Sequence, residues 1–318
     1  MKKTQRETNP FRYSDSNKRY HAYDYYLRHR FGGKTVKIPL DGGFSCPNID
    51  GRCGVGGCIY CSGRGSGDFC ALPSDSIAQQ FAKGVAMMGK KWQTERKIAY
   101  FQAHTNTYAP VSYLKERFEE ALRQDGVVGL NIATRADCLE DDVVDYLAEL
   151  SGRTALTVEL GLQTVHDETA RLINRGHSFE EFCRGYEKLR ERGIDVCVHL
   201  IFGLPGEDRE MMLESVRRVA ALRPSQLKLH LLYVIQGTRL GEMYQSGEYL
   251  PMEREEYIET VCDALELLPP ETVIGRLTGD GAPETLLAPE WSRRKTAVVN
   301  DIDKTLFARD SWQGKKYE

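Results

Sequence analysis

Short apolar runs alternate with longer segments in which apolar residues recur at helical spacing. Six runs rich in valine, isoleucine and leucine predict strands at Thr35–Leu40, Lys97–Gln102, Val127–Ala133, Ala155–Leu160, Asp195–Phe202 and Gln226–Leu232. The segments between them predict helices at Ile77–Lys90, Val111–Arg123, Asp141–Leu150, Phe179–Arg192 and Arg209–Leu222. Strands and helices that alternate in this way indicate an α/β fold with a parallel sheet, either open or curled into part of a barrel.

The pattern changes at both ends of this core. Ser74 is placed to cap the first of the five helices, and a further helix is expected at Glu253–Leu267, where Pro269 and Pro270 stop it. We therefore expect an N-terminal extension at residues 1–34, an α/β core at 35–250, and a C-terminal helix and tail at 251–318.

Polar and glycine-rich residues follow every expected strand. Ligands gather at the carboxyl ends of parallel strands, because the loops and helix N-termini converge there. The segments concerned are the loop after Leu40, Gln102–Tyr108, Thr134–Asp137, Glu159–Gln163, Gly203–Glu207 and Tyr233–Thr238. This arrangement suits a large polar cofactor.

The composition is that of an ordinary globular protein, with 41% hydrophobic and 28% charged residues in 318. No apolar run approaches the roughly 20 residues of a membrane span, and Met1–Phe11 is too polar for a secretory signal. Nine cysteines, several of them isolated within expected strands or helices, do not resemble a disulfide framework. We expect a protein of the reducing cytoplasm.

The net charge of −3 conceals an uneven distribution. Residues 1–40 carry +7, so the remainder carries −10. Five tyrosines and two phenylalanines lie among the basic residues from Phe11 to Phe31, a mixture that suits binding of phosphates and stacking on nucleic-acid bases. A segment whose tyrosines simply pack on the main domain would have the same composition.

Three cysteines follow the first expected strand with the spacing Cys46-x11-Cys58-x2-Cys61, in a glycine-rich loop. Three thiolates can hold an iron–sulfur cluster and leave one iron open, which a reaction centre requires. Cys53 lies in the same loop, so a closed four-cysteine zinc site is the alternative. Zinc ribbons usually have two close cysteine pairs, whereas this loop has one. The pattern favours iron–sulfur; the role of Cys70 stays open.

The cysteine spacing, the stretch Ile132–Leu139, the run Val158–Thr164 and the segment Leu172–His177 resemble the radical S-adenosylmethionine superfamily, and within it the YtqA/YhcC family, which is related to the catalytic subunit of the elongator complex. The resemblance implies a partial (βα)6 TIM-type barrel with N- and C-terminal extensions. It also implies a [4Fe-4S] cluster on Cys46, Cys58 and Cys61, and S-adenosylmethionine as second cofactor. The family does not depend on a cysteine at Cys53.

The same resemblance suggests residues that bind S-adenosylmethionine. Gln102 is expected to meet its amino group and Arg135 its carboxylate, where a guanidinium can bind in bidentate fashion. Glu159 and Gln163 are candidates for the ribose hydroxyls or polar groups of the substrate. Each has a structural alternative: a strand cap for Gln102, an ion pair with Asp137 for Arg135, and an internal salt bridge for Glu159. The adenine is expected against the backbone of Gly203 and Leu204.

His230 and Tyr233, at the end of the sixth strand, are the candidates for facing the substrate. The resemblance implies action on the wobble uridine of transfer RNA, converting a 5-carboxymethylaminomethyl group on (2-thio)uridine to 5-aminomethyl. Expected partners are the anticodon stem-loop, an electron donor such as flavodoxin or ferredoxin, and a downstream methyltransferase. The alternatives are a radical enzyme with a small-molecule or protein substrate, and a zinc-stabilised nucleic-acid-binding protein without catalysis.

Overall fold

The computed structural model describes residues 9–65, 74–89, 94–279, 281 and 283–318. The chain divides into two compact units. The first, which we call the cysteine-loop unit, comprises Leu27–Leu162 and Asn174–Cys197; the second, the C-terminal unit, comprises Met1–Tyr26, Gln163–Ile173 and Val198–Glu318. The predicted limits at residues 34 and 250 remain a prediction.

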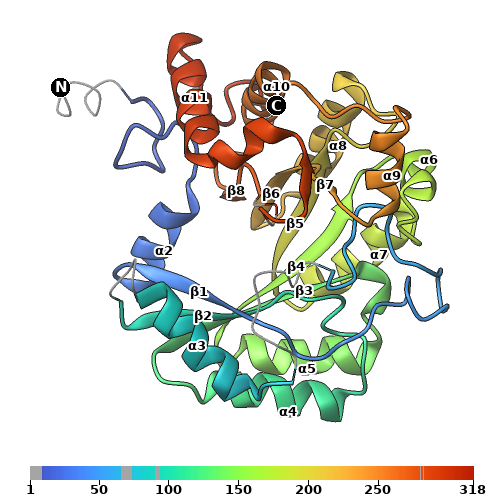
Figure 1. Cartoon of the computed structure of the whole chain (residues 1–318). Coiled ribbons are helices and arrows are strands. Elements are labelled where there is room, and N and C mark those ends of the chain that lie inside the picture. Colours follow the sequence, from blue (N-terminus) through green and yellow to red (C-terminus); the bar gives the residue numbers. More distant parts are fainter. Residues whose placement is uncertain (1–8, 66–73, 90–93, 280, 282) are drawn as a thin grey trace. The chain divides into compact units, whose positions relative to one another are not determined.

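The elements of the chain up to β5 are α2 (Tyr23–Phe31), β1 (Thr35–Leu40), α3 (Ile77–Gly89), β2 (Arg96–Phe101), α4 (Val111–Leu122), β3 (Val127–Thr134), η1 (Ala136–Cys138), α5 (Asp141–Ser151), β4 (Ala155–Gln163), α6 (Asp167–Leu172), α7 (Phe179–Glu191) and β5 (Asp195–Phe202). Strands β1 to β4 pair in parallel, and α3, α4 and α5 lie together along one face of them (Figure 1). The apolar spacing explains this face, since α4 buries Leu114, Phe118 and Ala121.

The remaining elements are α8 (Arg209–Leu222), β6 (Gln226–Leu231), β7 (Val234–Ile235), α9 (Arg239–Gln245), α10 (Arg254–Glu266), β8 (Val273–Arg276), β9 (Leu286–Ala288), η2 (Glu290–Arg294) and α11 (Lys295–Ala308). Strand β8 pairs in parallel with β6, and the main sheet has the order β1-β2-β3-β4-β5-β6-β8. The predicted parallel α/β sheet is confirmed. A seventh strand, supplied by the segment expected to be a tail, extends it.

The bounds of the predicted elements hold to within a few residues. Strands β1 and β5 begin and end where the sequence placed them. The cap of α3 was wrongly assigned to Ser74. Ser76 is the capping residue: its Oγ accepts from the Gln79 backbone, and its own N–H donates to Gln79 Oε1. None of the helices in the described residues has the length and apolar character needed to cross a membrane.

The N-terminal arm, which we define as residues 9–22, packs within the C-terminal unit. Phe11 and Tyr20 are buried, and the Arg19 carbonyl accepts a bond from the Gln313 backbone. Three of its cations form ion pairs with acids of the same unit: Arg12 with Glu271, Lys18 with Asp303, and Arg19 with Asp310. The arm therefore has the packing role that the sequence left as the alternative to nucleic-acid contact.

A candidate iron–sulfur site on the cysteine loop

The loop that follows β1, residues 41–65, holds the three cysteines in two tight turns. The Ile49 N–H donates to the Cys46 carbonyl at 2.8 Å, and the Cys61 N–H donates to the Cys58 carbonyl at 3.0 Å. Thr105, beyond the end of β2, donates from its backbone to the Ser45 carbonyl at 3.1 Å. Cys58 is buried, and Cys46 and Cys61 are partly exposed. The loop thus places three thiols beside the carboxyl end of the sheet, as expected.

The thiols lie close enough to influence one another's protonation. A hydrogen bond from Cys61 lowers the pKa of Cys58 well below the usual thiol value, assisted by the positive charges of Arg175 and Arg135. The same bond raises the pKa of Cys61, because the neighbouring sulfur holds the negative charge. Metals bind the thiolate form of cysteine, so this arrangement favours ligation at Cys58.

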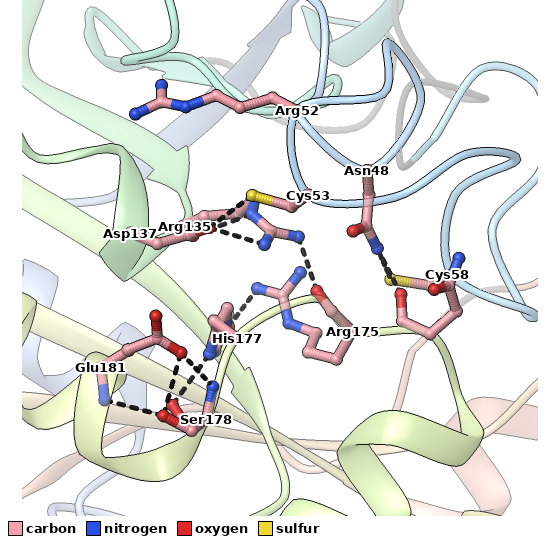
Figure 2. Close-up of polar contacts among 12 residues, drawn as sticks. Asn48, Arg52, Cys53, Cys58, Arg135, Asp137, Arg175, His177, Ser178 and Glu181 are labelled. Atoms are coloured by element: carbon pink, nitrogen blue, oxygen red, sulfur yellow. Dashed lines mark hydrogen bonds and ion pairs between the residues drawn. The ribbon is translucent and has the colours of Figure 1, made fainter.

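Asn48 connects the cysteine loop to a distant part of the chain. Its Nδ2 lies 3.6 Å from Cys58 Sγ and also donates to the Asn174 carbonyl (Figure 2). The amide is fully buried, and its Oδ1 has no hydrogen-bond partner among the described residues. Asn48 is therefore held against both the sulfur and the segment that begins at Asn174.

That segment, Asn174–His177, supports the loop from the other side. Asn174 has a left-handed backbone, with φ of 52°, and its Nδ2 donates to the Gly57 carbonyl at 2.7 Å. Gly176 also has a positive φ, of 78°, and a Cβ added there would lie 2.2 Å from Asn48 Oδ1. Only glycine fits this position without displacing the Asn48 side chain.

Arg135 forms the ion pair that the sequence left as an alternative. Its Nε and Nη2 donate to the two carboxylate oxygens of Asp137 at 2.9 and 2.8 Å, and its Nη1 donates to the Arg175 carbonyl at 2.7 Å. Although burial opposes the charge, Asp137 raises the pKa of Arg135 above its usual value. Arg175 is buried too and donates to the Gly161 carbonyl. Two buried guanidinium groups thus stand near the thiols.

Cys53 takes part in a different contact. Its exposed thiol lies 3.6 Å from Asp137 Oδ2, and Figure 2 shows the sulfur directed at the pair of Asp137 and Arg135. Burial and the Asp137 charge raise the pKa of the Cys53 thiol, which disfavours the thiolate that a metal would need. The geometry therefore separates Cys53 from the ligand set that the loop offers. Cys70 lies outside the described residues.

Glu159 forms the internal salt bridge that was the alternative to cofactor binding. It is fully buried, and its Oε1 accepts from Lys37 Nζ at 2.8 Å and from Asn131 Nδ2 at 2.7 Å. Gln102 follows β2, and its backbone donates to the Leu40 carbonyl at 3.3 Å. Both residues lie in the cysteine-loop unit with Arg135.

The other candidates belong to the C-terminal unit. Gln163 and Gly203 have positive φ angles of 79° and 85°. The Gly203 carbonyl accepts from Tyr249 at 2.7 Å, and Leu204 is buried. The centroids of the His230 and His199 rings are 5.1 Å apart, and the Tyr233 hydroxyl lies 3.2 Å from Thr278 Oγ1.

The residues around the loop suit a cluster better than a closed zinc site. Three thiols, a buried amide N–H directed at one sulfur and two nearby guanidinium groups stabilise a negatively charged iron–sulfur centre. Sequence reasoning proposed the thiols but assigned no role to Asn48, Asn174, Arg175 or Gly176. In the sequence, Asn174, Arg175 and Gly176 were marked only by lying in the segment Leu172–His177, which resembles the family.

Comparison with known proteins agrees with this site. Residues 49–219 match the Radical SAM superfamily, and residues 224–308 match the Radical_SAM C-terminal domain. The YtqA protein of Bacillus subtilis (strain 168) is 51% identical over 312 residues, which cover 98% of this chain and 97% of YtqA.

Two further proteins share more limited similarity. The tRNA uridine(34) acetyltransferase of Methanocaldococcus jannaschii is 33% identical over 163 residues, or 50% of this chain and 29% of that protein. Among solved structures, the Elp3 protein of Methanocaldococcus infernus with an N-terminal deletion superposes with a TM-score of 0.65 at 20% identity, covering 88% of this chain and 64% of that one. This likeness confirms the predicted partial-barrel fold.

Proposed function

Because the chain belongs to the radical S-adenosylmethionine superfamily, and within it to the YtqA/YhcC family, we propose that it is an enzyme that modifies the wobble uridine of transfer RNA. Its cofactors are a [4Fe-4S] cluster and S-adenosylmethionine. Membership contradicts the alternative of a zinc-stabilised protein without catalysis. The observation that carries the substrate is the similarity, over half of the chain, to a tRNA uridine(34) acetyltransferase.

When bound, the two cofactors supply a 5′-deoxyadenosyl radical able to remove a hydrogen atom from an unactivated carbon. We assign Cys46, Cys58 and Cys61 to the cluster. Asn48 holds Cys58 in place through its N–H, and Arg135 and Arg175 supply positive charge beside the thiolates. Cys53 has no part in ligation, since its thiol faces Asp137.

We keep the remaining candidates as proposals with sharper roles. Gln102 is assigned to the amino group of S-adenosylmethionine and Arg135 to its carboxylate; the two Arg135 contacts with Asp137 hold that guanidinium in one orientation. Glu159 is assigned to a ribose hydroxyl, and its ion pair with Lys37 holds the carboxylate in place.

Within the C-terminal unit, Gln163 is a second candidate for the ribose, because its Oε1 is buried and has no hydrogen-bond partner among the residues described. Gly203 and Leu204 are assigned to the adenine, and His230 and Tyr233 to the substrate.

The reaction we propose converts 5-carboxymethylaminomethyl-(2-thio)uridine to its 5-aminomethyl form in the cytoplasm. Removal of a hydrogen atom from the carboxymethyl carbon, followed by loss of one electron to the oxidised cluster, would leave an iminium. Water would then hydrolyse its carbon–nitrogen bond, giving the 5-aminomethyl group and releasing the two-carbon fragment as glyoxylate. A flavodoxin or ferredoxin is the proposed electron donor. A separate methyltransferase would complete a 5-methylaminomethyl group.

The test is nucleoside mass spectrometry of transfer RNA from cells that lack the protein. The carboxymethylaminomethyl nucleoside should accumulate, and it should disappear when wild type or Cys53→Ala is supplied but persist with Cys58→Ala. An unchanged nucleoside profile would reject the transfer RNA substrate. The alternative of a small-molecule or protein substrate would then take its place.

A further inference from the structure

A cavity lies within the C-terminal unit between the N-terminal arm and α11. Its volume is about 290 Å³, near the lower end for small-ligand sites. The lining residues that matter for its chemistry are Asn17, Arg19, Asn300, Asp303, Lys304 and Phe307. None of them has a role in the reaction proposed above.

A buried acid lines the cavity and has one acceptor that the described residues leave unused. Asp303 is only 6% exposed, and one of its carboxylate oxygens, Oδ2, accepts from Lys18. The other oxygen, Oδ1, has no hydrogen-bond partner within the described part of the chain. A buried oxygen of this kind costs free energy unless a donor reaches it, so the cavity suits a ligand that carries N–H groups.

An aromatic ring forms the apolar wall. Phe307 is 52% exposed although it lies on the same helix as the buried Asp303. The Arg19 guanidinium lies 5.0 Å from the ring centroid and is itself held by Asp310 at 3.0 Å. The ring is therefore backed by a fixed cation, while half of its surface remains available for stacking.

An exposed cation completes the lining. The Lys304 Nζ pairs with Asp301 Oδ1 at 2.8 Å on the surface of α11, and an exposed pair of this kind is weak enough for the ammonium to contact a phosphate as well. An exposed ring, a buried acceptor and an exposed lysine are the three groups with which proteins recognise an unstacked nucleotide: the base stacks, its edge is hydrogen-bonded, and its phosphate is neutralised.

We propose that this cavity binds one unstacked nucleotide of an RNA whose base carries an exocyclic amino group. The base stacks on Phe307, its amino group donates to Asp303 Oδ1, and Lys304 contacts the phosphate. That the RNA is transfer RNA rests on the proposed function; the nucleotide site itself does not.

Photo-crosslinking of the full-length protein to bulk transfer RNA tests the site directly. Trypsin cuts after Lys304 and Arg309 and so releases Phe307 in the peptide Thr305–Arg309. We expect this peptide to carry the crosslink, attached to adenine, guanine or cytosine. A crosslinked uracil would overturn the role of Asp303, and crosslinks confined to other peptides would overturn the site.

Binding measurements with matched variants provide a second readout. Phe307→Ala should weaken transfer RNA binding at least about fivefold, the lower end expected for loss of one base stack, whereas Phe307→Trp should retain it. Leu250→Ala removes another exposed apolar side chain of the same unit and should have no effect. Equal binding by wild type and Phe307→Ala would overturn the proposal.

The outcomes separate this proposal from the proposed function. If the nucleoside analysis supports the proposed reaction but Phe307→Ala binds transfer RNA as tightly as the wild type, the nucleotide site is rejected and the reaction is retained. An unchanged nucleoside profile in cells lacking the protein, together with the expected crosslink, would reject the proposed reaction and support the nucleotide site. Binding of adenosine monophosphate without any crosslink to RNA would overturn the RNA assignment in favour of a free nucleotide.

Discussion

Asn48 donates a hydrogen bond to Cys58, with 3.6 Å between Nδ2 and Sγ, and the same amide nitrogen donates to the carbonyl of Asn174. One buried side chain thus joins a cysteine assigned to the cluster to a segment more than a hundred residues further along the chain. Because hydrogen bonds to sulfur tune iron–sulfur centres, this contact has both a structural and a redox consequence.

The structural consequence is testable without any cofactor. Asn48→Ala removes the donor and leaves the Asn174 carbonyl without it in a partly buried setting, so the free energy of unfolding should fall by about 1–3 kcal/mol in urea denaturation. Ile49→Ala changes the next residue, which is 43% exposed, and should lower the free energy of unfolding less than Asn48→Ala does. Equal losses in the two variants would contradict the role given to Asn48.

The redox consequence concerns the loaded protein. An N–H directed at a ligand sulfur stabilises the reduced cluster, so its loss in Asn48→Ala should shift the midpoint potential to more negative values. Potentiometric titration followed by electron paramagnetic resonance measures this shift. A shift to more positive values would refute the assignment, and so would an unchanged potential.

Gly176 and Gly56 form a matched pair. Their φ angles are nearly equal, at 78° and 81°, but a Cβ at Gly176 would lie 2.2 Å from Asn48 Oδ1, whereas one at Gly56 would meet no atom within 4 Å. Both alanine variants carry the backbone strain; Gly176→Ala alone pushes on Asn48. We expect Gly176→Ala to be the less stable by at least about 1 kcal/mol and to retain less iron after reconstitution.

His177 should make stability depend on pH. Burial, with the charges of Arg175 and Arg135, lowers its pKa to about 4 from an ordinary 6.5. Between pH 4 and pH 6.5 the unfolded chain binds a proton at His177 and the folded chain does not. The free energy of unfolding therefore has its full value above pH 6.5 and falls as the pH is lowered toward 4.

The loss at pH 4.5 should be about 2–3 kcal/mol relative to pH 7.5. Urea denaturation of wild type and His177→Gln at both values measures it, because glutamine does not titrate. Between pH 7.5 and pH 4.5 the wild type should lose about 2–3 kcal/mol more of its free energy of unfolding than His177→Gln does. Parallel stability curves for the two proteins would show that His177 titrates normally.

Much of the fold could be read from the sequence, because the buried strands are continuous apolar runs and most helices have one apolar face. The exceptions have physical reasons. Helix α2 has a sequence of tyrosines and basic residues in which only Leu27 is buried. Strand β8 is four residues long, includes Gly275, and exists because it pairs with β6. Helix α11 does show apolar spacing at Val298, Ile302 and Leu306, which could have revealed it.

The site was less accessible to sequence reasoning. Cysteine spacing proposed the ligands. The alternative for Arg135 named its partner, Asp137, and the alternative for Glu159 expected an internal salt bridge without naming Lys37. The contacts of Asn48 with Asn174 and Gly176 join two loops, and no periodic pattern reports such a contact. The direction of the Cys53 thiol likewise depends on the turn that carries it.

The ligand assignment is the central claim, and iron and sulfide analysis after anaerobic reconstitution tests it most directly. Wild type and Cys53→Ala should each bind about four iron and four sulfide per chain, whereas Cys46→Ala, Cys58→Ala and Cys61→Ala should bind far less. Loss of the cluster in Cys53→Ala, or one tightly held zinc per wild-type chain, would contradict a cluster held by Cys46, Cys58 and Cys61.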